Sequence, residues 1–173
     1  MEKTKNKLPK NQKKFFNDLS DYLETPLYFY GSVQRDDYFP GRSDIDVDIF
    51  TDNESSIITK LQHFLHINRN NFKKFVWRLN NNNKIVYGNK IMYYNYDQKI
   101  KTEISIYNIN VKEDILYEHN HKIKLPFYVS WLLILLKILY YDFNLINASY
   151  YRYLKKKLLT NGLGLPDDDF VVI

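Results

Sequence analysis

Three aspartates, Asp44, Asp46 and Asp48, alternate with apolar residues in a pattern that is typical of a half-buried strand. Because side chains alternate along a strand, the three carboxylates are expected on one face, about 6.6 Å from one to the next. At an effective dielectric of about 20, two such carboxylates repel by roughly 2.5 kcal/mol. A divalent cation reverses the sign of that energy, so the pattern predicts a site for two hard cations, Mg²⁺ or Mn²⁺.

A Gly-Ser dipeptide, Gly31-Ser32, precedes this segment at the expected end of a short strand and the start of a helix or turn. Glycine lets a ligand's phosphate approach the backbone closely, and the free N–H groups and dipole of a helix start favour an anion. Gly-Ser pairs are common by themselves. Because this one belongs to the strand immediately before the acidic strand, phosphate and metal are expected to meet there.

Together these residues resemble the nucleotidyltransferase superfamily, which includes DNA polymerase β, kanamycin nucleotidyltransferase and the minimal nucleotidyltransferases. That family has an apolar residue, Gly, then Gly or Ser, and after a gap of about ten residues Asp-x-Asp or Asp-x-Glu between apolar residues. This chain has Tyr30-Gly31-Ser32 and, further on, Ser43-Asp44-Ile45-Asp46-Val47. The resemblance covers residues 27–50. It implies that Asp44 and Asp46 bind two Mg²⁺ or Mn²⁺ ions and that Gly31 and Ser32 bind the triphosphate of a nucleotide.

The family also has a third carboxylate on a later strand, and the resemblance implies Glu103 for this role. An exposed strand glutamate is the alternative interpretation of Glu103, and Asp97 is the second candidate for the third carboxylate. Asp48 shares the acidic face, but the family uses two carboxylates on this strand. We therefore expect Asp48 to support the site structurally rather than to bind a metal.

Weaker features lie in the expected C-terminal helices. Lys137, in an apolar helix, and Ser149-Tyr150-Tyr151, at the start of the next, look like the Lys helix and the Ser-Tyr helix of poly(A)- and poly(U)-adding nucleotidyltransferases. There the Lys and Ser hold the triphosphate and the Tyr stacks on the base. The alternative for Lys137 is a side chain that extends to the surface. Arg35 and Arg42 flank the Gly-Ser turn and either clamp the triphosphate or are ordinary surface residues.

The resemblance implies transfer of a nucleoside monophosphate from a nucleoside triphosphate to an acceptor hydroxyl, with release of pyrophosphate. The acceptor stays open between an RNA or DNA 3′ end, a protein side chain and a small molecule. A catalytically degenerate module that binds a nucleotide or a partner protein is the alternative function. Nothing in the sequence specifies an oligomeric state.

Apolar periodicity predicts helices over residues 9–24, 53–66, 126–141 and 147–160, and strands over 27–30, 44–50, 85–87, 91–96 and 100–109. Gly88-Asn89 is expected to be a turn, residues 32–37 a short helix or turn, and residues 68–79 fit either a helix or a strand. The order predicts an α+β domain. We expect a mixed, mostly antiparallel sheet of about five strands flanked by helices, with two helices at the C-terminal end.

The length of 173 residues predicts a single domain over residues 1–173. The net charge of +5 comes from residues 1–14, which we expect to be a solvated arm, although such an arm can also contact phosphates. The other residues balance, and residues 161–173 are expected to be a tail. The absence of cysteine excludes disulfides, thiolate metal sites and a cysteine nucleophile. No signal peptide or membrane span of about 20 apolar residues is evident, which predicts a cytoplasmic protein without a membrane partner.

Overall fold

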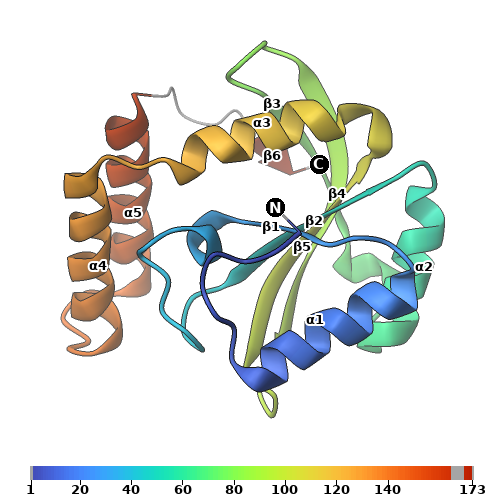
Figure 1. The fold of residues 1–173 in the computed structure, drawn as a ribbon, viewed down its shortest axis with the longest axis horizontal. Helices are drawn as coiled ribbons and strands as arrows, with labels where there is room; N and C mark the ends of the chain where they lie inside the picture. Colours follow the sequence, from blue (N-terminus) through green and yellow to red (C-terminus); the bar gives the residue numbers. More distant parts are fainter. Residues whose placement is uncertain (1, 165–169, 173) are drawn as a thin grey trace.

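A mixed sheet forms the centre of the protein (Figure 1). The computed structural model describes residues 2–164 and 170–172. Within these residues the sheet has six strands in the order β1-β2-β5-β4-β3-β6, and only β2 and β5 pair in parallel. The strands are β1 Tyr28–Tyr30, β2 Ile45–Thr51, β3 Lys73–Arg78, β4 Ile85–Asn95, β5 Ile100–Asn108 and β6 Phe170–Val172. The expected α+β class and the mostly antiparallel sheet are confirmed.

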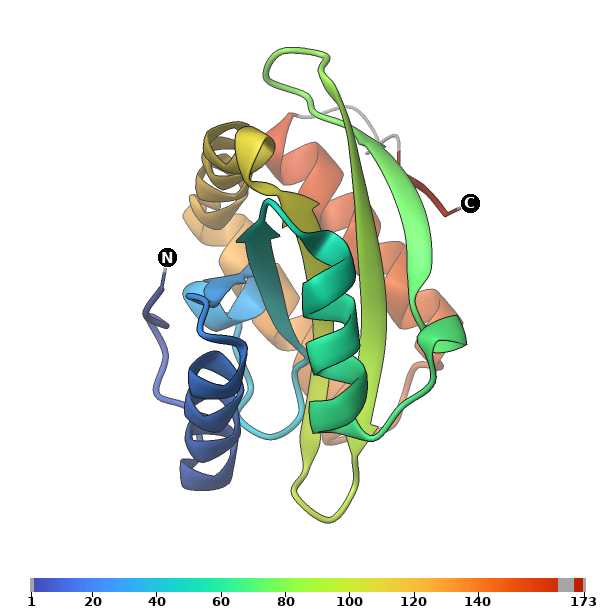
Figure 2. The same cartoon turned by 90° about the vertical axis from the view of Figure 1, so that its right-hand side faces the viewer.

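Helices flank this sheet, and two of them pair at the C-terminal end (Figure 1). Helices α1 and α2 lie together on the opposite side of the molecule from α4 and α5, and Figure 2 shows α2 in front of the strands. The helices are α1 Lys10–Leu23, α2 Glu54–Leu65, α3 Lys112–Ile123, α4 Phe127–Tyr141 and α5 Ala148–Leu163. Short 3₁₀ turns are η1 Gly31–Gln34, η2 Arg69–Asn71 and η3 Ile109–Val111.

The expected apolar stripes hold α1 and α2 on the sheet. Phe16, Leu19 and Leu23 of α1 are buried at helical spacing and pack in one core with the inward residues of β2 and β5. Helix α2 begins after Asn53, whose side-chain oxygen accepts a hydrogen bond of 3.0 Å from the Ser56 N–H. This cap was expected from the sequence. It satisfies one of the backbone donors that a helix start leaves unpaired.

Two predictions about the strands are settled by tertiary contacts. The turn expected at Gly88-Asn89 is wrong, because β4 runs without interruption through both residues. A Cβ atom on Gly88 would lie 2.7 Å from the Phe75 ring, so glycine here makes room for a neighbouring strand rather than for a turn. The ambiguous segment 68–79 forms η2 and strand β3.

Helix α3 and strand β6 were not expected from the sequence. The buried residues of α3 are Ile115, Glu118 and His119, which is too polar a set to produce an apolar stripe. Strand β6 pairs with the edge strand β3. Of the expected C-terminal tail, residues 165–169 and 173 lie outside the described residues.

No single helix among residues 2–164 and 170–172 is long and apolar enough to cross a membrane. The segments Ile109–Ile123 and Phe127–Tyr141 meet that test only as a pair, and their axes are bent by 82° at the junction.

Candidate functional site

The turn after β1 brings its backbone against the acidic strand. Gly31 begins η1 with a φ of 68°, in the region that favours glycine. A Cβ atom on Gly31 would lie 2.0 Å from Oδ2 of Asp46, so no other residue fits without displacing that carboxylate. Ser32 follows and is buried. The Gly-Ser turn and the second aspartate of the acidic row are therefore direct neighbours, as the sequence predicted.

Glu103 lies beside Asp46 on the neighbouring strand. The parallel pairing of β2 and β5 places Asp46 opposite Glu103, and neighbouring strands lie about 4.8 Å apart. Both side chains line the same cavity. Asp97, the second candidate for the third carboxylate, is exposed in the turn that joins β4 to β5. The structure thus brings Glu103, and not Asp97, to the acidic pair.

Lysines neutralise two of the three carboxylates. Nζ of Lys101 lies 2.6 Å from Oδ1 of Asp44, in an ion pair whose side chains are 43% and 38% exposed. Nζ of Lys90 lies 3.7 Å from Oε2 of Glu103. Burial lowers the pKa of Lys101, but the hydrogen bond and charge of Asp44 outweigh burial and raise it.

The ionised form of Asp46 is disfavoured by burial and by the neighbouring carboxylates. Its pKa is raised to about 6, mainly by burial; Lys155 opposes the rise, and the charges of Glu103 and Asp44 contribute to it. Burial also raises the pKa of Glu103, against the opposing effect of Lys90. A proton or another cation at this place therefore relieves a real electrostatic penalty.

The donor set suits a hard dication, although it is not yet assembled. Carboxylate oxygens are the ligands that Mg²⁺ and Mn²⁺ prefer. Asp46 and Glu103 are adjacent, whereas Asp44 has to leave Lys101 to join them. In the part of the chain that the structure describes, no group of three or more acidic or histidine side chains already converges to hold a metal ion. The residues fit such an ion after one partly exposed ion pair opens.

Asp48 is engaged by α3 rather than by the acidic pair. Its side chain is fully buried, and Oδ2 lies 2.7 Å from Nε2 of His119. Burial raises the pKa of Asp48, and His119 opposes that rise. The ring of His119 stacks on Tyr30, with ring centroids 4.0 Å apart. Asp48 thus ties β2 to α3, in line with the structural role expected for it.

Two cavities meet at Asp46. One, of about 280 Å³, contains Glu103 and Trp77 in its wall, and we call it the Trp77 cavity. The other, of about 410 Å³, contains Asp44 and Tyr151, and we call it the Tyr151 cavity. Three residues line both of them: Ser32, Asp46 and Lys155. The site is thus a junction that can receive two groups, one on each side of a carboxylate.

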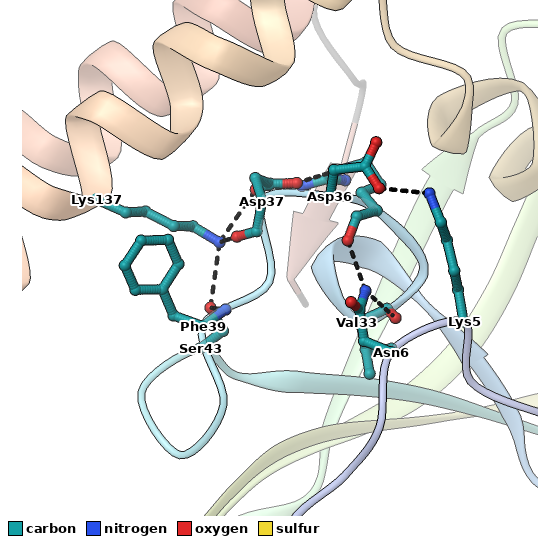
Figure 3. A network of polar contacts seen from close by, with 9 residues as sticks. Lys5, Asn6, Val33, Asp36, Asp37, Phe39, Ser43 and Lys137 are labelled. Carbon is teal, nitrogen blue, oxygen red and sulfur yellow. Dashed lines mark hydrogen bonds and ion pairs between the residues drawn. The ribbon is translucent and has the colours of Figure 1, made fainter.

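Lys137 is a buried connector (Figure 3). Its ammonium group donates to the Asp37 carbonyl and to Oγ of Ser43 at 3.1 Å, and lies 3.0 Å from Oδ2 of Asp37. Arg35, expected as a phosphate clamp or a surface residue, is buried in an ion pair with the same Asp37 carboxylate. Burial lowers the pKa of Lys137 to about 8, against the opposing effect of Asp37. The interpretation of Lys137 as a side chain that reaches the surface is wrong, because Asp37 and Ser43 hold it inside.

Three other predicted residues lie apart from the junction. Ser149 and Tyr150 are exposed and line neither cavity. Arg42 also lines neither cavity and pairs with Asp142 at the end of α4. The next residue in α5, Tyr151, is buried and lines the Tyr151 cavity. A shift of one position along the helix separates the predicted aromatic residue from the one in the cavity.

Lys155 is the cation that sequence reasoning missed. It is half-buried and forms no hydrogen bond or ion pair with any described residue, yet it lines both cavities. Its position one helical turn after Tyr151 is the signal that could have identified it. An unpaired ammonium beside Asp46 is suited to bind an anionic ligand.

The N-terminal segment, expected to be a solvated arm, is held against the Gly-Ser turn (Figure 3). Nδ2 of Asn6 donates to the carbonyl oxygens of Val33 and Arg35, and Lys5 pairs with Asp36. The first turn of α1 takes up residues 10–14. Residues 5 and 6 thus support the backbone that follows Ser32.

Comparison with known proteins agrees with this geometry. The family model described as "Nucleotidyltransferase domain" matches residues 9–120, which is more than half of the chain. The match includes Gly31, Ser32, Asp44, Asp46 and Glu103 and stops before α4. A search of curated proteins found no match.

Proposed function

Because the chain belongs to the nucleotidyltransferase domain family, we propose that it transfers a nucleoside monophosphate from a nucleoside triphosphate to an acceptor hydroxyl. The observation that carries this proposal is the junction at Asp46. There the Gly31 turn, the neighbouring carboxylate of Glu103 and the unpaired Lys155 surround one point between two cavities. A donor on one side and an acceptor on the other can then meet beside the carboxylates.

The Tyr151 cavity is the place for the triphosphate. Ser32 and Lys155 line it and supply a hydroxyl and an ammonium for phosphate oxygens. Tyr151 and the neighbouring Tyr140, whose rings stack with centroids 4.3 Å apart, give the nucleoside an aromatic wall. Lys137 also lines this cavity, with its ammonium group held by Ser43 and Asp37.

Asp44, Asp46 and Glu103 would hold the Mg²⁺ or Mn²⁺ ions. Bound there, two such ions neutralise phosphate charge and lower the pKa of the acceptor hydroxyl. The chain's own residues align the groups, and the Glu103 carboxylate accepts the hydroxyl proton. A bond forms between the acceptor oxygen and the α-phosphorus, the bond to the bridging oxygen breaks, and pyrophosphate leaves.

A transfer assay tests the proposal. Each α-labelled nucleoside triphosphate is incubated with Mg²⁺ or Mn²⁺ and with RNA, DNA, protein and small-molecule acceptors. Label is expected to reach one acceptor class with the natural protein and with Asp97→Asn, whose carboxylate is exposed in a turn. The Asp46→Asn variant is expected to fold and to transfer nothing. Turnover by Asp46→Asn at the natural rate would refute the assignment.

The second candidate is a nucleotide-binding module without turnover. The lysine pairs at Asp44 and Glu103 favour it, because they occupy oxygens that the ions need. Calorimetric titration with a nucleoside triphosphate and Mg²⁺ separates the two functions. Binding without transfer to any acceptor would favour the module, and binding with transfer the enzyme.

A further inference from the structure

The Trp77 cavity lies on the Glu103 side of the junction and is built from parts far apart in the sequence. Trp77 and Tyr107 come from strands β3 and β5, Ile123 ends α3, and Leu159 comes from α5. With a volume of about 280 Å³, the cavity is slightly smaller than most small-molecule sites, which span about 300–1,000 Å³. Apolar and aromatic walls are typical of such sites.

Two hydrogen-bond donors in the wall of this cavity, the Trp77 indole nitrogen and the Lys155 ammonium group, have no acceptor among the described residues. Trp77 is only 4% exposed, and its indole nitrogen has no hydrogen-bond partner among the described residues. A buried N–H without an acceptor costs free energy, and buried tryptophans usually have one. Nζ of Lys122 lies 4.8 Å from the Trp77 ring centroid and 3.6 Å from Oε1 of Glu118, and Lys155 lines the same cavity. A ligand that supplies acceptor atoms beside a flat ring would satisfy this wall.

We propose that the Trp77 cavity binds the acceptor, a small molecule of about nucleoside size or less, with a planar ring, hydrogen-bond acceptors and a free hydroxyl. This rests on the proposed nucleotidyl transfer. The ring lies along Trp77, its acceptor atoms face the indole N–H and Lys122, and the hydroxyl lies toward Asp46 and Glu103. The oxygen attacks the α-phosphorus, its proton passes to Glu103, and pyrophosphate departs into the Tyr151 cavity.

A nucleic-acid strand fits this cavity less well. Strand binding needs a row of cations along a groove that continues past the reacting end. Here Lys122 already pairs with Glu118 at 3.6 Å, and Ile123 and Leu159 supply apolar surface rather than charge. Beyond residues 1–14 the basic and acidic residues of the chain are equal in number. The cavity therefore favours a compact acceptor.

Tryptophan fluorescence tests occupancy independently of turnover. The chain has two tryptophans, so Trp131→Phe leaves Trp77 as the single reporter. This variant is titrated with uridine, with 4-(hydroxymethyl)benzoate and with glucose, in saturating α,β-methylene-ATP and Mg²⁺ to fill the nucleotide side. A saturable change in Trp77 emission is expected with the two ring compounds and not with glucose. No change with either ring compound at about 10 mM would overturn the proposal, since specific ligands bind more tightly.

Two matched variants localise the effect. Leu159→Phe in the Trp131→Phe protein fills the cavity and is expected to weaken ring-compound binding by about tenfold or more, as a steric block does. Leu145→Phe, in an exposed loop outside both cavities, is expected to leave binding unchanged. Equal affinity in both variants would place the ligand elsewhere.

Titration with an oligonucleotide tests the alternative that the acceptor is a nucleic acid. If decathymidylate binds about tenfold or more tightly than thymidine, the acceptor is a nucleic-acid end and the small-molecule proposal fails. Calorimetry of nucleoside triphosphate binding is run on the same protein. If the protein binds no nucleoside triphosphate, the proposed transfer function is refuted. If it binds the nucleotide normally but Trp77 emission does not change with either ring compound, only the acceptor assignment is refuted.

A second inference comes from the outer face of α4, which is apolar and uncovered. Five neighbouring side chains on it are between 43% and 78% exposed: Phe127, Tyr128, Trp131, Leu132 and Leu135. The single charged residue of α4, Lys137, is buried on the other side. Contiguous apolar surface of more than a few hundred Å² usually marks an interaction site.

We infer that this face binds a second copy of the chain. At roughly 200 Å² per aromatic side chain, the three aromatic residues alone expose about 400 Å², half of the roughly 800 Å² that each partner contributes to a standard interface. Because the face carries no charge, two copies can meet about a two-fold axis without like-charge repulsion. Trp131 lies centrally, where tryptophan contributes most to binding.

Sedimentation equilibrium tests the dimer. A mass of twice 21.0 kDa is expected for the natural protein, and a monomer for Leu135→Glu. Tyr96→Glu, in the exposed β4–β5 turn, is expected to remain dimeric. A monomer at about 100 µM would overturn the inference, as would a dimer that survives Leu135→Glu or binding of this face to neutral lipid vesicles in place of self-association.

Discussion

Asp46→Asn is expected to remove transfer and at the same time to stabilise the protein. In the folded chain the pKa of Asp46 rises from 3.8 to about 6, mainly because of burial, with Lys155 opposing the rise and Glu103 and Asp44 contributing to it. Between these two pKa values the folded carboxyl is protonated while the unfolded one is ionised. Stability therefore falls as the pH rises through this window, and above about pH 6 the whole penalty is present. An asparagine amide carries no charge and avoids it.

The size of the effect follows from the shift. One pKa unit corresponds to about 1.4 kcal/mol, so a rise from 3.8 to about 6 gives an upper limit of about 3 kcal/mol. The two cavities bring solvent to Asp46, which screens its charge and reduces the expected gain to about 1–2 kcal/mol. For a chain of this length that gain raises the Tm by about 2–8 °C.

Thermal unfolding in EDTA measures the gain, with circular dichroism as the signal. Asp46→Asn is compared with the natural protein near pH 7.5 and near pH 4, where the difference is expected to shrink because both folded forms are then uncharged at this position. Asp97→Asn is the matched control and is expected to leave Tm unchanged at both pH values. An unchanged Tm of Asp46→Asn near pH 7.5, or a gain that persists near pH 4, would refute the electrostatic reasoning.

Further substitutions separate structural from binding roles. Gly31→Ala is expected to lower the free energy of unfolding by about 2 kcal/mol or more and to abolish transfer, because the new Cβ atom would collide with the Asp46 carboxylate. Gly41→Ala, at a similar φ but in open space, is expected to lower it by about 1 kcal/mol. Chemical denaturation measures both changes. Lys155→Ala is expected to weaken nucleoside triphosphate binding by about tenfold or more in calorimetry with little change in Tm, unlike exposed Lys157→Ala, which should leave both unchanged. Lys137→Met is expected to destabilise by about 3 kcal/mol in urea unfolding, because it removes one partner of a buried pair.

The arrangement of the candidate site could be predicted from the sequence where it depends on residues close together in the chain. Gly31 and the acidic row are separated by a short loop, and the two-residue period of a strand determines which carboxylates share a face. The family resemblance implied Glu103 as the third carboxylate, and the parallel register of β2 and β5 places this residue opposite Asp46. These features depend on the strand period and on a turn that requires glycine.

Features that depend on packing between distant parts of the chain could not be predicted from the sequence. Gly88 has a turn signal, yet the ring of Phe75 on the next strand requires a glycine inside β4. Lys137 meets Asp37 and Ser43 from about a hundred positions away, so its burial could not be read from its helix. Helix α3 was missed because His119 and Glu118 face inward, where they bind partners on the sheet and in the β3–β4 loop.

Charge neutralisation explains how the acidic residues of the site are tolerated in the folded protein. Carboxylates packed around one junction are costly when they stay unpaired in a folded protein, so the chain supplies a partner for most of them: Lys101 for Asp44, Lys90 for Glu103 and the His119 ring for Asp48. Burial raises the pKa of Asp46 as it does those of Asp48 and Glu103, and Asp46 is also the residue against which Gly31 allows no side chain. A row of aspartates would destabilise a purely structural strand. Here the ammonium groups of Lys101 and Lys90 neutralise Asp44 and Glu103, and a metal ion can replace them. Asp46, which forms no ion pair with a described residue, lies against the Gly-Ser turn, and an incoming cation there gains favourable charge interactions with it.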